Sequence, residues 1–394
     1  MTPPAGTPAL RYAYGTNGLA DLRLPDALAL LAGLGYDGVG LTLDHMHLDP
    51  LAPDLARRTA ETARLLGRHG LTVTVETGAR YVLDPRRKHG PTLLDADPEG
   101  RAARLGLLRT AVRVAADLGA HAVHCFSGVA PPDMPRYAAW QHLTDGIGAL
   151  LDTADTAGVA VALEPEPGHL VGDLAGFHRL RSAIGGSPGL GLTLDVGHCQ
   201  CLEPATPAAC VRDAAPWLRH VQIEDMRRGV HEHLPFGEGE IDFPPVLGAL
   251  REAGYAGLVT VELPRHSHAG PDQAAAALPF LHAAEHAAVR GTPPAPAGSS
   301  AHRAPAGRAH PAAPARPAGS AAPVPPGTSP GPAPAADSAP ASAAAPQQAA
   351  PAPPAKAAPL AAPLAAGPER TDERPGTAPP AGASRSGTPA GARP

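Results

Sequence analysis

Eight short apolar runs alternate with longer helical patterns along residues 1–290, and this alternation most restricts how the chain can fold. The runs are rich in β-branched residues, which is typical of buried strands. They cover residues 10–15, 38–43, 71–76, 120–126, 159–164, 190–195, 220–225 and 258–263. Several are apolar at consecutive positions, as expected of parallel strands that are covered on both faces.

The segments between these runs carry the start and stop signals of amphipathic helices. The first begins at Pro25 and ends near Gly35, the second ends at Gly70, the third spans 99–119 and the fourth spans 135–158. Repeated units of helix, glycine and strand fit right-handed crossovers. Eight such units favour a closed (β/α)₈ barrel, or TIM barrel, of the α/β class. A doubly wound open sheet is the alternative, weakened by the lack of a Gly-rich phosphate loop after the first run.

The composition changes after Arg290, where Pro, Ala, Gly and Ser take over almost completely. Such a segment cannot bury enough apolar surface to offset the entropy lost on ordering it. The sequence therefore predicts two regions: a barrel over residues 8–290 and a disordered Pro/Ala/Gly-rich tail over residues 291–394.

Charge and cysteine content narrow the class of partner. The net charge of −5 gives no general attraction to nucleic acid or to a membrane surface. Four cysteines in a chain of 394 residues do not make a disulfide framework, and no apolar run is long enough to span a membrane. We therefore expect a cytoplasmic protein with a small-molecule substrate, and a homo-oligomer is compatible with the sequence.

Polar side chains close most of the eight runs. The C-terminal ends of barrel strands meet at one mouth, so we expect these side chains to converge there. They are Glu76, His124, Glu164, Asp195, Gln222, Glu224, Asp225 and Glu262, with Glu166, His198, Arg265 and His266 in the following loops. Several carboxylates held close together repel one another unless a cation lies among them. Mixed carboxylate, amide and imidazole ligands suit Mn²⁺ or Mg²⁺, with Co²⁺ and Zn²⁺ as alternatives.

Five segments carry a resemblance to a known family. LEPEPG, LDVGH, HVQIED, HLPFGEGEIDF and VTVELPRHSH together resemble the xylose isomerase-like barrel superfamily, and the resemblance covers roughly residues 10–285. This superfamily includes ketose 3-epimerases, sugar and sugar-phosphate isomerases, inosose dehydratases and endonucleases of the endonuclease IV type. Residues 229–243 are predicted to form a loop over the mouth, with Gly237 and Gly239 allowing a tight backbone path.

The resemblance to the epimerases implies a metal ligand set. Their single cation is held by Glu, Asp, His and Glu from four strand ends, and the matching positions are Glu164, Asp195, Gln222 and Glu262. The usual His is replaced by Gln222, and His220 stands two residues earlier. An amide oxygen is a poor Zn²⁺ ligand, so the substitution favours Mn²⁺ or Mg²⁺.

The resemblance to the endonucleases implies further ligands, because His124, His198 and His231 fall where those proteins hold a cluster of three zinc ions. The sequence departs from that pattern at Glu76, Gln222 and Gly229, where His, His and Asp would be expected. A complete trinuclear cluster is therefore not expected.

The implied activity is isomerisation or epimerisation of a sugar, sugar phosphate or cyclitol through an enediolate. Glu164 and Glu262 would act as acid and base, as well as ligands. His198 would contact substrate oxygens, as would further predicted substrate-binding residues: Glu76, Glu166, Arg265 and His266. Two alternatives remain open: a metal-dependent hydrolase or lyase on the same barrel, and a barrel that binds a metabolite without turning it over.

Overall fold

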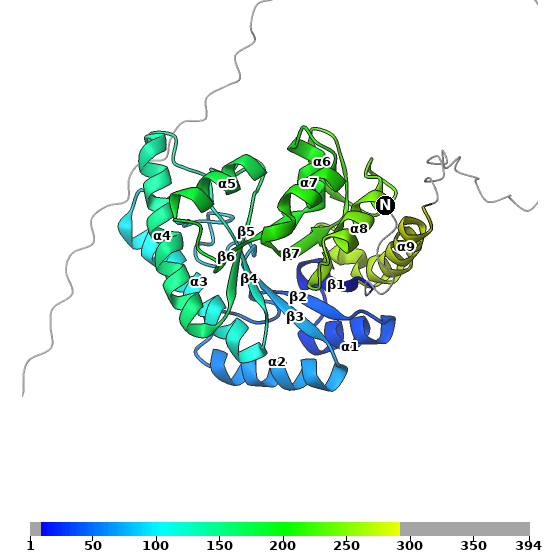
Figure 1. Ribbon diagram of the computed structural model, residues 1–394. Coiled ribbons are helices and arrows are strands. Elements are labelled where there is room, and N and C mark those ends of the chain that lie inside the picture. Colours follow the sequence, from blue (N-terminus) through cyan, green and yellow to red (C-terminus); the bar gives the residue numbers. More distant parts are fainter. Residues whose placement is uncertain (1–8, 292–394) are drawn as a thin grey trace, which may run out of the picture. The chain divides into compact units, whose positions relative to one another are not determined.

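The computed structural model describes residues 9–291, and within them eight parallel strands close into a barrel (Figure 1). The order around the barrel is β1-β10-β7-β6-β5-β4-β3-β2. The strands are β1 (Arg11–Gly15), β2 (Gly38–Thr42), β3 (Thr72–Glu76), β4 (Ala122–Phe126), β5 (Ala160–Glu164), β6 (Leu190–Asp195), β7 (Leu218–Ile223) and β10 (Leu258–Val261). The predicted (β/α)₈ fold is confirmed, and each of the eight apolar runs supplies one strand.

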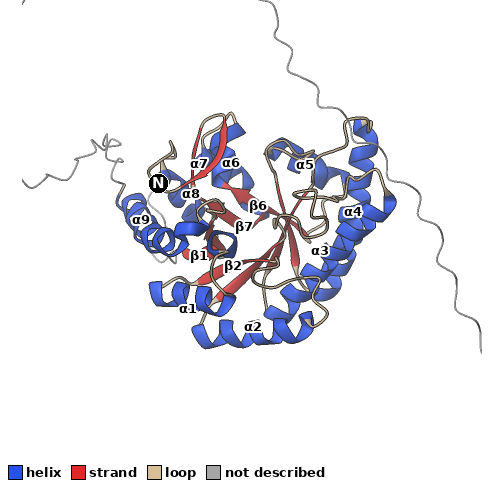
Figure 2. Cartoon of the chain, turned by 180° about the vertical axis from the view of Figure 1, so that it is seen from behind, coloured by secondary structure: helices blue, strands red, loops and turns tan. Residues whose placement is uncertain are grey.

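Helices surround the barrel strands on the outside (Figure 2). They are α1 (Leu24–Leu34), α2 (Leu55–His69), α3 (Pro98–Leu118), α4 (Arg136–Ala157), α5 (Leu174–Ala183), α6 (Val196–Leu202), α7 (Pro207–Ala214), α8 (Phe243–Glu252) and α9 (Gly270–Arg290), with short 3₁₀ turns η1 (Thr16–Leu19), η2 (Ala215–Trp217) and η3 (Ser267–Ala269). Gly35 and Gly119 end α1 and α3 in the left-handed conformation, with φ of 95° and 69°. These glycines are the predicted stop signals, because the left-handed region disfavours a residue with a Cβ.

The ends of the predicted regions are only partly covered. The predicted tail lies outside the described residues except for Gly291, which caps α9. Pro8, the first residue of the predicted barrel, also lies outside them. Strand β7 begins at Leu218, two residues before the apolar run that predicted it. Within residues 9–291, no helix has the length and apolar character needed to cross a membrane.

A short antiparallel hairpin stands where the sequence predicts only a loop. It pairs β8 (Asp225–Arg227) with β9 (Val230–Leu234). The Asp225 carboxylate accepts hydrogen bonds from the backbone N–H groups of Met226, Gly237 and Ile241, at 2.8–3.1 Å. The bonds from Gly237 and Ile241 tie the segment after β9 to the start of β8, and a Cβ on Gly239 would overlap the same carboxylate.

The last helix fastens the first strand. Glu285 of α9 is buried, and its carboxylate accepts from the backbone N–H of Leu10 (3.0 Å) and from the Tyr12 hydroxyl (3.0 Å). It also forms a 2.6 Å ion pair with Arg251 of α8. Burial raises the pKa of the Tyr12 hydroxyl, and the Glu285 charge raises it further. Glu285 therefore joins the two ends of the barrel and a neighbouring helix.

Candidate metal and active site

The mouth at the C-terminal ends of the strands holds a hollow of about 440 Å³. Seven of the predicted site residues line it: His124, Glu164, Glu166, His198, His231, Glu262 and Arg265. Asp195, Gln222 and Glu76 do not line it and are at least 98 % buried. His266 also lies outside the lining. The structure thus brings together most of the predicted set, with acidic groups buried beneath the hollow.

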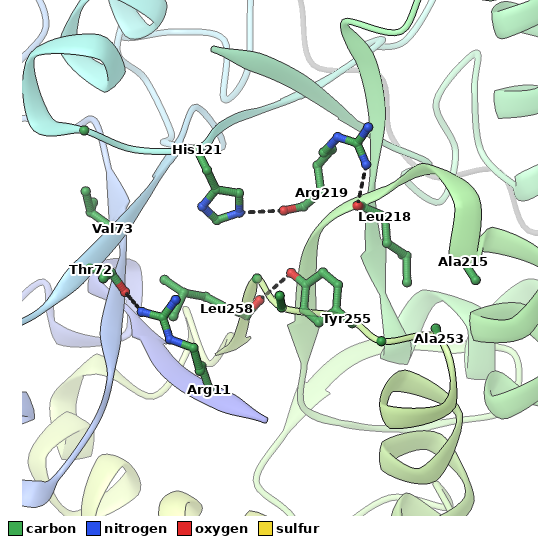
Figure 3. Close-up of a pocket in the computed structure, with 14 residues that line it drawn as sticks. Arg11, Thr72, Val73, His121, Ala215, Leu218, Arg219, Ala253, Tyr255 and Leu258 are labelled. Atoms are coloured by element: carbon green, nitrogen blue, oxygen red, sulfur yellow. Dashed lines mark hydrogen bonds between the residues drawn. The ribbon is translucent and has the colours of Figure 1, made fainter. Parts of the chain in front are cut away.

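A second hollow, of about 570 Å³, lies at the opposite, N-terminal face of the barrel (Figure 3). It is lined by first residues of strands, such as Arg11, Thr72 and Leu258, together with His121 and Arg219. Helices of the barrel end at this face, so cations here compensate the partial negative charge of helix C-termini. Carboxylate side chains are absent from this lining. The carboxylates that could carry acid–base or metal chemistry lie instead at the mouth.

Glu164, the last residue of β5, is held by two histidines. Its Oε2 lies 2.6 Å from Nε2 of His124, and its Oε1 lies 3.3 Å from Nδ1 of His198. The backbone N–H of Thr77 donates to Nδ1 of His124 (3.3 Å), which leaves Nε2 as the donor to Glu164. Both carboxylate oxygens of Glu164 therefore have an imidazole neighbour, and its side chain is fixed at the edge of the hollow.

Three histidines gather above this carboxylate. His198 comes from α6, while His231 and His233 alternate along β9, and the three offer nitrogens within 4.8 Å of one another. Burial, followed by the charge on His198, lowers the pKa of His231 to about 4. Burial also lowers the pKa of His233 to about 3. Burial acts in the same direction on His198, but Asp195 and Glu164 outweigh it and raise its pKa. His231 and His233 are thus neutral at pH 7, the form that binds metals.

A carboxylate-rich group lies beside these histidines. Asp195, Glu224, His233 and Glu262 each offer one ligand atom, and the four atoms lie within 4.8 Å of one another. Burial raises the pKa of Glu224 well above its usual range, and the charges of Asp195 and Glu262 add to this. Burial also raises the pKa of Glu262 well above its usual range, with Glu164 adding to it. So many acidic groups in one place cannot all ionise without a cation.

The donor chemistry of this group fits a divalent cation. Glu224 is fully buried, and neither of its oxygens meets a hydrogen-bond donor within the described part of the chain. The same holds for Oδ2 of Asp195 and Nδ1 of His233. Carboxylate oxygens with one imidazole suit Mn²⁺, Mg²⁺, Co²⁺ or Zn²⁺.

Glu224 and His233 were not assigned as ligands from the sequence, and Asn17 was not considered. Glu224 was noted at a strand end but was not assigned as a ligand, although it faces the same way as residues 220 and 222 of β7. Asn17 of η1 was not considered, and its Nδ2 donates to Oε1 of Glu262 at 2.9 Å. Its signal was its position directly after the first strand.

Glu76 and His220 form a buried pair inside the barrel. Nε2 of His220 lies 3.0 Å from Oε1 of Glu76, and the Thr42 hydroxyl donates to Oε2 at 3.2 Å. Burial would raise the pKa of Glu76, but the hydrogen bond and charge of His220 outweigh it and lower the pKa. Glu76 is thus engaged within the barrel, and a contact between it and substrate remains a prediction.

The rim of the hollow carries unpaired positive charge. Arg80, Lys88 and Arg265 line it, and none of them forms an ion pair with a carboxylate of residues 9–291. Glu166 also lines the hollow, and burial, followed by the charge of Glu164, raises its pKa to about 7. The outer part of the hollow is therefore suited to an anionic group.

Comparison with known proteins agrees with this architecture. The family described as "Xylose isomerase-like TIM barrel" matches residues 28–284. Among curated relatives, L-ribulose-5-phosphate 3-epimerase UlaE of Shigella boydii serotype 18 is 24% identical over 244 residues, which cover 60% of this chain and 81% of that protein. The same epimerase from Salmonella paratyphi C is 23% identical over 244 residues, with the same two coverages.

Solved structures with the same fold include two epimerases. D-allulose 3-epimerase from Methylomonas sp. has a TM-score of 0.57 and 21% identity, covering 72% of this chain and 100% of that one. An L-ribulose 3-epimerase has a TM-score of 0.59 and 20% identity, covering 72% and 96%. The barrel order and the strand-end carboxylates agree with the family match over residues 28–284. The chain therefore belongs to the xylose isomerase-like TIM barrel family.

Proposed function

We propose that this chain is a divalent-metal-dependent epimerase or isomerase that moves a proton next to the carbonyl of a sugar, sugar phosphate or cyclitol. The observation that carries the proposal is the pair of carboxylates Glu164 and Glu262, which line one hollow from β5 and from the end of β10. These two strands are separated by β6 and β7 in the barrel order, so the carboxylates flank the hollow from two sides. The epimerase names of the relatives support this proposal.

In this scheme one carboxylate removes the proton from carbon, and the other returns a proton to the opposite face. Glu164 is oriented by His124 and His198, while Glu262 is oriented by the amide of Asn17. A divalent cation held by the buried carboxylates beneath the hollow would stabilise negative charge on the enediolate oxygens. His198 and His231 lie at the hollow with their Nε2 atoms 3.0 Å apart, where they can hydrogen-bond substrate hydroxyls.

The positive rim favours a substrate with an anionic group. Arg80, Lys88 and Arg265 could bind a phosphate or carboxylate remote from the reacting carbons. We therefore propose a ketose phosphate or a sugar acid ahead of a neutral sugar. The anion would hold the substrate in one orientation between the two glutamates, so that its reacting carbon lies between them.

The test measures the exchange of a carbon-bound proton of the substrate with solvent deuterium. NMR monitors this exchange in D₂O with Mn²⁺ or Mg²⁺ added. Ketose 5-phosphates, the free ketoses and inososes form the substrate panel. Glu164→Gln and Glu262→Gln should both abolish epimerisation, although either variant can still exchange the proton of one epimer through its remaining glutamate. Glu61→Gln, on the exposed face of α2, is the matched control. Epimerisation retained in both active-site variants would refute the scheme.

A second candidate is hydrolysis of a phosphoester, supported by the cluster of His198, His231 and His233. Imidazole-rich sites favour zinc, which activates water for attack at phosphorus. The same protein samples incubated with phosphomonoesters and phosphodiesters test this directly. Release of phosphate or alcohol, with no exchange of a carbon-bound proton for deuterium, would favour hydrolysis.

A further inference from the structure

We propose that the divalent cation of this barrel is held by Asp195, Glu224, His233 and Glu262. Glu224 and His233 thereby replace the ligand that Gln222 does not supply. The assignment rests on the metal-dependent reaction proposed above. It departs from the ligand set expected from the sequence, in which Glu164 and Gln222 bind the cation.

The four groups enclose one point from four different elements. Asp195 ends β6, Glu224 directly follows β7, His233 lies on β9 and Glu262 directly follows β10. One ligand atom from each lies within 4.8 Å of the other three. Ligands about 2.1 Å from a tetrahedral cation lie roughly 3.4 Å apart. A small inward movement of the side chains therefore gives a coordination shell.

The unpartnered atoms of these groups point to a missing ligand. Both oxygens of Glu224 are buried without a hydrogen-bond donor within the described residues, and Nδ1 of His233 also lacks a partner there. Oδ2 of Asp195 likewise accepts no hydrogen bond there, and its imidazole neighbour is Nε2 of His198, 3.5 Å away. The other oxygen of Asp195 accepts the backbone N–H of His198 at 2.8 Å. A proton shared between Asp195 and Glu224 would satisfy one pair of oxygens but not the imidazole, which lies 3.7 Å from Glu224. A cation satisfies all of these atoms at once.

The surrounding backbone makes room for Glu224 in particular. A Cβ on Gly197 would overlap Oε1 of Glu224, so a residue with a side chain at 197 would push the carboxylate out of the group. His233 lies on β9, which pairs with β8, and Asp225 at the start of β8 binds the segment that follows β9. Both features position proposed ligands.

Gln222 and Glu164 are placed differently. Gln222 precedes Glu224 by two residues on the same face of its strand, which puts it roughly 6.6 Å deeper in the barrel. Like Asp195, with which it is in register, it is buried and does not line the hollow, and its Oε1 also lacks a hydrogen-bond donor among the described residues, so the Gln222→Met variant below decides whether it shares the cation. Glu164 has both oxygens beside the imidazoles of His124 and His198. This leaves Glu164 as a proton-transfer group that does not share the cation.

Metal affinity of the full 394-residue chain tests this assignment without reference to turnover. The protein is stripped with chelator and titrated with Mn²⁺, with free Mn²⁺ read by EPR and binding heat by calorimetry. Glu224→Gln and His233→Gln should each weaken Mn²⁺ binding by about 100-fold or more. Glu164→Gln and Gln222→Met should stay within about threefold of wild type. Glu232→Gln, exposed on the same strand as His233, is the matched control.

A second variant guards against misfolding. Gly197→Ala keeps every ligand but displaces Glu224, so it should also weaken Mn²⁺ binding by at least about tenfold. Circular dichroism and the unfolding midpoint of each metal-free variant show whether it is folded. The assignment is overturned if folded Glu224 and His233 variants bind Mn²⁺ as wild type does, if Glu164 or Gln222 variants lose the affinity instead, or if wild type binds no divalent cation.

Failure of this assignment and failure of the proposed function give different results. If wild type epimerises a sugar in a metal-dependent way and Glu224→Gln binds Mn²⁺ as tightly as wild type, the ligand set is wrong and the proposed reaction is supported. If Mn²⁺ binding depends on Glu224 and His233 but no sugar of the panel exchanges its proton, the proposed reaction is wrong and the ligand set is supported.

Discussion

Replacing His220 by leucine takes the imidazole away from a carboxylate buried inside the barrel. Among the described residues, the side chain of Glu76 would keep the hydrogen bond from the Thr42 hydroxyl, at 3.2 Å. An unpaired buried charge of this kind destabilises a fold by about 3–5 kcal/mol. Glu76 can instead take up a proton, which at pH 7 and a reference pKa of about 4.3 costs about 3.7 kcal/mol. The easier route limits the loss, so we expect about 3–4 kcal/mol at pH 7.

Because Glu76 can take up a proton in the His220→Leu variant, the loss of stability in this variant depends on pH. In the variant the folded-state pKa of Glu76 lies above its unfolded value, so the protonated form contributes stability that is lost as pH rises. The gap to wild type should therefore shrink by about 1.4 kcal/mol for each pH unit, or by about 2 kcal/mol between pH 7 and pH 5.5. In wild type His220 lowers the pKa of Glu76, so the ionised form of Glu76 contributes stability that is lost as pH falls, which is the opposite pH dependence.

A double-mutant cycle checks the reasoning, with urea unfolding followed by circular dichroism in the presence of EDTA. Glu76→Met alone leaves Nε2 of His220 buried without its partner, at about 1–3 kcal/mol. Removing both residues leaves neither charge nor orphaned imidazole, so the double variant should lie within about 1–2 kcal/mol of wild type. The expected coupling is about 3–4 kcal/mol. Additive losses, or a gap for His220→Leu that does not change with pH, would refute it.

Three further outcomes follow from described contacts. Tyr12→Phe removes the hydroxyl that donates to Glu285 at 3.0 Å, and urea unfolding should show a loss of about 1.5–3 kcal/mol. Gly38→Ala places a Cβ 2.8 Å from the carbonyl oxygen of Thr72, and thermal unfolding should report a destabilisation of about 1–3 kcal/mol. Burial lowers the pKa of His169 to about 3, so the unfolded chain takes up its proton first and wild type loses stability as pH falls below about 6.5. Because its side chain is only partly buried, His169→Phe should lose about 1 kcal/mol less than wild type between pH 7 and pH 5, and an equal loss in both proteins would contradict this origin.

The fold was readable from the sequence because its signals repeat. Eight apolar runs alternate with helical patterns, and α1, α2, α3, α4 and α9 each end at a left-handed glycine, so an error in one unit would not change the architecture. Strand ends were less certain, as β7 shows by beginning at Leu218. The start of a strand depends on backbone pairing with its neighbours, which no residue type encodes.

The position of a candidate site residue could be predicted where the residue ends a strand, and could not be predicted where tertiary contacts decide it. Glu164, Asp195 and Glu262 end strands or directly follow them, and the structure brings them to the mouth. Glu224 was not assigned because its place depends on the missing side chain of Gly197. The pairing of Glu76 with His220 joins residues 144 positions apart. No local pattern carries such a contact.

The fastening of β1 by Glu285 has a consequence for how the protein is made. Strand β1 leaves the ribosome first, but its partner β10 and the carboxylate that receives Leu10 and Tyr12 come from the far end of the barrel sequence. Until β10 has emerged, the nascent barrel has an open seam with an unpaired edge on β1, and until residue 285 has emerged the Leu10 N–H and the Tyr12 hydroxyl lack their acceptor. We expect the seam to be the last part to become protected, and a chain arrested just before β10 to bind strongly to chaperones that recognise exposed strands.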